Sequence, residues 1–133
     1  MTTLPTWMRR ALFATAAMNL VGAALFAPPA RALRAVAGFP EGEHPLYLMT
    51  AGMFVLLFGF GYLWAAIAGR ADRLFIGVAA VGKLSFFALL VSFWAAGALS
   101  VRAPLVGTGD LFFAILFLMW LYGPLSPVAS QPR

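Results

Sequence analysis

Four long apolar runs constrain this chain more than any other feature. A helix rises 1.5 Å per residue and the hydrocarbon core of a bilayer is about 30 Å thick, so a span needs about 20 apolar residues. Proline and glycine pairs such as Pro28-Pro29 and Gly123-Pro124 end these runs, as expected of helix termini. We therefore expect membrane-spanning helices over residues 11–27, 46–68, 74–98 and 104–122.

Composition supports lipid as the solvent of this chain. Of the 133 residues, 63% are hydrophobic and 10% are charged, whereas soluble domains carry about 25% charged residues. A soluble fold would have to expose large apolar patches, which aggregate. We predict an all-α fold: one transmembrane domain over residues 1–133, an antiparallel up-down four-helix bundle with the bilayer as its first partner.

The polar composition excludes several kinds of function. The absence of cysteine rules out disulfides and thiolate metal sites. Eight of the nine basic residues are arginines that flank the apolar runs, so the net charge of +5 indicates membrane anchoring and not nucleic-acid binding. Glu41, Glu43 and His44 fall together in the first loop but supply too few ligands for a metal site. We predict no metal, no cofactor and no catalytic residues.

The first run has a second interpretation. Arg9-Arg10, the apolar run and the small residues of 27–32 resemble a secretory signal with its cleavage site. We expect a true span instead. After it, the segment from Arg31 to Val36 could form a short helix that lies at the interface.

Arginine placement predicts the orientation. Four spans put both termini on one side of the membrane, and the side with more arginine is usually cytoplasmic. We expect an inner-membrane protein of a bacterium with both termini in the cytoplasm. The terminal side would hold Arg9, Arg10, Arg70, Arg73 and Arg133, and the other side Arg31, Arg34 and Arg102.

Small residues predict how the helices meet. Gly52, Gly59 and Ala66 are spaced by seven and share one helix face, and Gly77 and Ala80 begin a similar face on the third span. Close backbone approach must hold helices together in lipid, where no hydrophobic force acts between them. The tight turn of residues 69–73 predicts that the second and third spans form a hairpin.

Three polar residues within the spans form the candidate site. Lys83 would lie about 14 Å from the inner end of its helix, Asn19 about 12 Å from that side, and Asp110 about 9 Å below the outer end. Such residues usually face the protein interior and pair with one another. Asp110 could instead cap the fourth helix, but the roughly 18 Å that would remain is too short to span. A structural Lys83–Asp110 pair and a role in proton or substrate handling both stay open.

Short motifs resemble small bacterial four-helix membrane proteins of the DoxX-like type. They include Gly38-Phe39-Pro40, Gly59-Phe60-Gly61-Tyr62, Gly82-Lys83-Leu84 and Gly109-Asp110-Leu111. The resemblance implies a small subunit of a quinone-using membrane oxidoreductase, or a partner of a redox protein. Contact of His44 or Asn19 with a quinone or pigment stays open, since nothing in the spacing selects either ligand. Residues 16–20 and 80–84 are also alike, which would suit a parallel two-hairpin repeat.

Two functions remain. The first is a non-enzymatic accessory or assembly subunit of a larger membrane complex, partnered by another membrane protein or by copies of itself. The alternative is a homo-oligomeric transporter or channel for protons or a small solute, which would use Asn19, Lys83 and Asp110.

Overall fold

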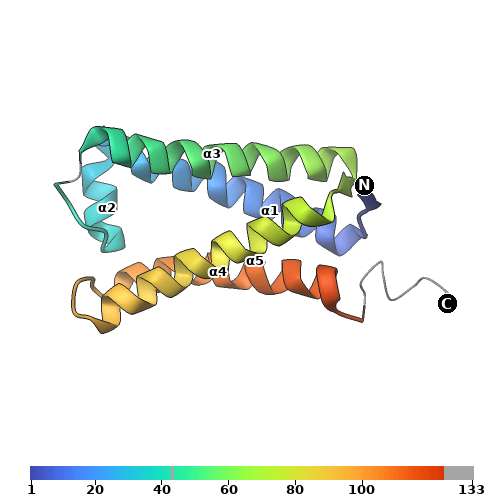
Figure 1. Cartoon of the computed structure of the whole chain (residues 1–133). Helices are drawn as coiled ribbons and strands as arrows, with labels where there is room; N and C mark the ends of the chain where they lie inside the picture. Colours follow the sequence, from blue (N-terminus) through green and yellow to red (C-terminus); the bar gives the residue numbers. More distant parts are fainter. Residues whose placement is uncertain (43, 125–133) are drawn as a thin grey trace.

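The chain forms four long helices that run back and forth along one axis (Figure 1). The computed structural model describes residues 1–42 and 44–124. The long helices are α1 (Thr6–Ala23), α3 (Pro45–Ala68), α4 (Arg73–Ala95) and α5 (Arg102–Tyr122). The 3₁₀ turns η1 (Ala24–Phe26) and η2 (Pro28–Ala30) lead into the short helix α2 (Arg31–Ala37), and the strands β1 (Thr2–Thr3) and β2 (Arg70–Ala71) pair antiparallel. The predicted all-α bundle, with its short helix in the first loop, is confirmed.

Three of these helices are long and apolar enough to cross a membrane: α3, α4 and α5. A fourth candidate joins α1 and η1 to the segment Pro28–Ala37, with a bend of 89° between the two parts. The chain is therefore an integral membrane protein with three or four candidate spans among its described residues, and lipid covers its apolar outer surface.

The helix ends follow local sequence rules. Asp72 caps α4, because its carboxylate accepts hydrogen bonds from the backbone N–H groups of Leu74 and Phe75. The α3 helix ends at Gly69, which has the left-handed conformation that favours glycine. The first long helix begins at Thr6, so Arg9 and Arg10 lie inside the helix, before the expected span. The α4 helix ends at Ala95, within the stretch expected for the third span.

The helices pack as two pairs, α1 with α3 and α4 with α5. The hairpin predicted between the second and third spans is only partly right. The two helices are consecutive and antiparallel, but α3 and α4 lie close only near the β2 turn and diverge toward the α2 end (Figure 1). The contact near the turn includes Phe75, whose ring stacks against Phe58 with 6.0 Å between ring centroids.

Glycine allows α1 and α3 to approach closely, as predicted. A Cβ on Gly52 would lie 2.8 Å from the Cβ of Phe26, and one on Gly59 would lie 3.1 Å from Leu20. Ala66 on the same face is fully buried. The prediction failed for Gly77, because a Cβ there would meet nothing within 4 Å.

The two pairs are built alike. Arg9 on α1 donates to the carbonyls of Ala66 and Ile67 at the end of α3, and Arg73 on α4 donates to the carbonyl of Leu121 at the end of α5. In each case the arginine of one helix donates to carbonyls in the last turn of its partner. The pairs are therefore tied by equivalent contacts.

The correspondence continues toward the middle of the bundle. Asn19 and Lys83 each come ten positions after these arginines. Their partners, the carbonyl of Val55 and the carboxylate of Asp110, are on α3 and α5. These contacts support the parallel repeat suggested by the likeness of residues 16–20 to 80–84.

The core lies at the terminal end of the bundle. It joins the beginnings of α1 and α4 to the ends of α3 and α5, and Tyr62, Phe117 and Trp120 are its largest members. Tyr62 and Phe117 meet at 5.7 Å between ring centroids. The strand β1 and the end of α5 also lie at this end (Figure 1). Because the core closes one half, any internal space must lie in the other half.

Candidate functional site

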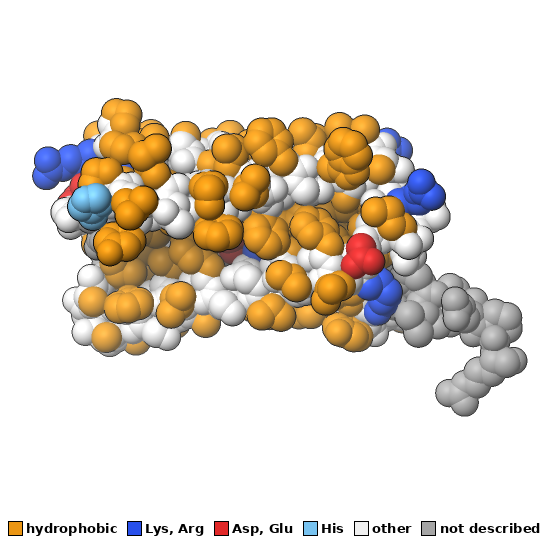
Figure 2. All heavy atoms as spheres, turned by 45° about the horizontal axis from the view of Figure 1, so that its top comes forward, with side chains coloured by type: hydrophobic (Ala, Val, Ile, Leu, Met, Phe, Trp, Pro, Cys, Tyr) orange, Lys and Arg blue, Asp and Glu red, His pale blue; other side chains and the backbone are white. Residues whose placement is uncertain are grey.

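A cavity of about 370 Å³ lies where α3 and α4 diverge. Figure 2 shows the hollow on the face between these helices, with basic and acidic atoms visible at its floor. All four long helices contribute to its walls, through apolar residues such as Phe54, Phe58, Phe86 and Val106. It extends from the middle of the bundle toward the α2 end, where Leu25, Phe26 and Phe39 line it.

The three polar residues predicted from the sequence meet at the floor of this cavity. The Lys83 Nζ donates to Asp110 Oδ1 at 2.7 Å and to Asn19 Oδ1 at 3.1 Å. The Asn19 Nδ2 in turn donates to the carbonyl of Val55 at 3.1 Å. The cluster therefore joins α1, α3, α4 and α5, and the prediction that these side chains face one another is confirmed.

Burial differs within the cluster. The side chain of Lys83 is 5% exposed and that of Asp110 is 21% exposed. Asp110 lies in the interior of α5, so it is not the cap of that helix. The ammonium group is thus enclosed by protein, while the carboxylate also faces the cavity.

Aromatic rings complete the surroundings of the lysine. Its Nζ lies 5.5 Å from the centre of the Tyr62 ring and 6.0 Å from that of Phe113. Ring faces attract cations, most strongly where water is absent. Lys83 is therefore held by one carboxylate, one amide and two rings, which offset the loss of its hydration.

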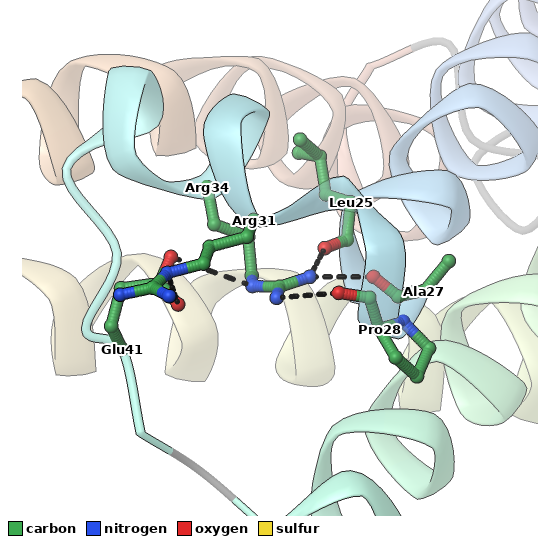
Figure 3. Close-up of polar contacts among 6 residues, drawn as sticks. All are labelled: Leu25, Ala27, Pro28, Arg31, Arg34 and Glu41. Carbon is green, nitrogen blue, oxygen red and sulfur yellow. Dashed lines mark hydrogen bonds and ion pairs between the residues drawn. The ribbon is translucent and has the colours of Figure 1, made fainter.

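A second polar site, at Arg34, was not expected from the sequence. Figure 3 shows its guanidinium turned into the η1–η2 bend, where it donates to the carbonyls of Leu25, Ala27 and Pro28 at 2.8, 2.6 and 3.2 Å. From its place beside an apolar run, Arg34 is expected only to contribute to topology. A guanidinium has five N–H donors in a fixed plane, which suits several carbonyls at a chain bend.

The described residues of the first loop, Glu41 and His44, take part in other contacts. Glu41 lies 3.5 Å from Arg31 and 3.9 Å from Arg34. His44 caps α3, where its Nδ1 accepts from the backbone N–H of Leu46. Glu43 lies outside the described residues, and no group of three or more potential ligands occurs within them.

No family model, no curated protein and no solved structure matches this chain.

Within the described residues, the cavity ends against the packed core. Tyr62 closes it toward the terminal end, and the packed core lies behind that ring. Its walls are apolar and its polar groups are gathered at one end. Such a space suits binding better than conduction, because a pathway for ions needs polar contacts along its length.

Proposed function

We propose that this protein is a non-enzymatic accessory or assembly subunit of a larger membrane complex. One observation carries the proposal: nearly all of the described chain is helical bundle, and charged side chains in and beside the spans are used to join helices. Lys83 pairs with Asp110, while Arg9 and Arg73 bind helix ends. The short motifs resemble those of DoxX-like proteins, and this resemblance is what supports a redox complex of the bacterial inner membrane as the larger complex.

The test is recovery of the complex from the native membrane. The chain is tagged at its chromosomal locus and purified in mild detergent after brief cross-linking in cells. The proposal expects a larger membrane protein in constant ratio to the chain, and loss of that protein's assembly when the chain is deleted. A lone, stable species that has an activity of its own would contradict the proposal.

A second function, transport by a homo-oligomer, is favoured by the place of the charged pair. The pair lies where the two similar helix pairs meet, and transporters built from parallel repeats bind substrate at such an interface. Flux of protons or small solutes into liposomes would be compared for the wild type and Lys83→Ala. Transport requires that the wild type exceed empty vesicles and that the variant lose the difference. Flux at the empty-vesicle level in both would exclude it.

A further inference from the structure

The carboxylate of Asp110 supplies an available hydrogen-bond acceptor at the cavity floor. Lys83 donates to Oδ1 of Asp110. Among the described residues, no hydrogen bond reaches the second carboxylate oxygen, and Asp110 lines the cavity. A carboxylate can accept several hydrogen bonds, and in an apolar environment an unused acceptor is costly. The floor therefore offers a place for an O–H or N–H donor.

The net charge of the cavity floor restricts the head group of a ligand further. One ammonium and one carboxylate lie 2.7 Å apart, so the floor as a whole is neutral. An anionic head would compete with Asp110 for Lys83, and a cationic head would compete with Lys83 for Asp110. Either would add an uncompensated charge in surroundings of low dielectric constant. A neutral head that donates a hydrogen bond avoids both penalties.

The walls define the rest of the ligand. They are formed by apolar and aromatic side chains from the floor to the α2 end, and the cavity faces the lipid between α3 and α4 (Figure 2). Its volume of about 370 Å³ is at the small end of the roughly 300–1,000 Å³ that is typical of ligand sites. An apolar chain of small cross-section fits this shape.

We propose that the cavity binds a neutral single-chain amphiphile, whose hydroxyl or amide head donates a hydrogen bond to Asp110 and whose chain lies between α3 and α4. The ligand enters sideways from the bilayer. This inference concerns the cavity alone, so it stands whether or not a larger complex is recovered.

The probe is dodecanol that carries a photoreactive diazirine on its chain. The wild-type protein is placed in lipid nanodiscs, irradiated with the probe and digested, and the labelled peptides are identified by mass spectrometry. We expect labelling at Phe54, Phe58 or Phe86, which line the cavity. Label spread evenly over the lipid-facing surface would overturn the proposal.

Unlabelled competitors test the head group. Dodecanol should displace the probe, while dodecyl methyl ether, dodecanoate and dodecylamine should compete about tenfold less well. For the ether, the loss of one hydrogen bond to a charged group accounts for the tenfold difference. For the two ions, the difference comes from the uncompensated charge. Equal competition by the ether would mean that the cavity selects only for the apolar chain, and better competition by the anion or the cation would reverse the charge argument. These comparisons use the wild type, so they do not depend on the folding of a variant.

A pair of glycine variants tests whether the probe binds in the cavity. Gly82 lines the cavity and Gly77 does not, yet a Cβ at either position meets nothing within 4 Å. Gly82→Leu should fill the cavity and lower specific labelling about tenfold, while the control Gly77→Leu should label like the wild type. Equal labelling of the two variants would place the probe elsewhere.

Discussion

Lys83 and Asp110 show that the energetic cost of a charge inside a bilayer depends on its partner. Each side chain alone would be an uncompensated ion inside the membrane, which is expensive. Together, at 2.7 Å, they are a neutral unit to which Asn19 adds a third hydrogen-bonding group. The contribution of either residue to the stability of the fold therefore depends on the presence of the other.

Removing one partner of the pair should harm the fold more than removing both. Lys83→Met or Asp110→Leu leaves the other group buried without its partner, and we expect a loss of about 3–5 kcal/mol for each single variant. The double variant Lys83→Met/Asp110→Leu should recover most of this loss, since it restores neutrality. Thermal unfolding in detergent measures the three variants. Single-variant effects that simply add in the double variant would show that the two residues do not act as a pair.

This cluster was predictable from the sequence because helix geometry fixes depth. Counting residues from the expected helix ends placed Asn19 and Lys83 at nearly the same level and Asp110 about 7 Å away, within reach of an extended lysine side chain. In a bundle of this size, polar groups at one level find each other. The unused acceptor on Asp110 was not predictable, because it depends on how far α3 and α4 diverge.

At the scale of elements, an arginine near the membrane surface can hold a chain bend in place, a role that its position in the sequence does not reveal. Arg34 is 7% exposed and binds three carbonyls at the bend before α2. Its neighbour Arg31 has a side chain that is 78% exposed. In the sequence, both residues are arginines beside an apolar run, so the two roles cannot be told apart. Only the fold separates a surface charge from one that holds a bend in place.

Replacing Arg34 should loosen the bend. Arg34→Ala removes the charged donor that three carbonyls share, and we expect a loss of about 2–3 kcal/mol because hydrogen bonds to a charged group are strong. The matched control Arg31→Ala should change stability by less than about 1 kcal/mol, as is usual for an exposed ion pair. Thermal unfolding and hydrogen exchange of the amides in α2 measure both effects. Equal exchange in the two variants would remove the role assigned to Arg34.

The whole molecule consists of two similar helix pairs that are packed at one end and open at the other. The packed end contains the core, and the open end contains the cavity. The sequence predicted four apolar helices in an antiparallel bundle, since hydropathy determines spans directly. Hydropathy alone did not predict which helices pair, because each helix is apolar on most of its surface and so has no distinct packing face. The likeness of residues 16–20 to 80–84 suggested the pairs that the structure has, α1 with α3 and α4 with α5.

Orientation in the membrane is a prediction for the whole molecule, and the lack of native cysteine makes it easy to test. Thr3 in β1 and Ala98 between α4 and α5 are exposed at opposite ends of the bundle. From the arginine asymmetry, we expect Ala98→Cys to react with an impermeant thiol reagent added outside intact spheroplasts. Thr3→Cys should react only after the membrane is opened. The opposite pattern would invert the predicted topology.

The division into pairs also bears on how the chain enters a membrane during synthesis. Lys83 and Asp110 belong to the same pair, separated along the chain by 27 positions. The second half can therefore leave the translocation machinery as one hairpin, with its ammonium and carboxylate already joined. Neither charged group is then exposed to lipid without its partner while a distant segment of the polypeptide is synthesised.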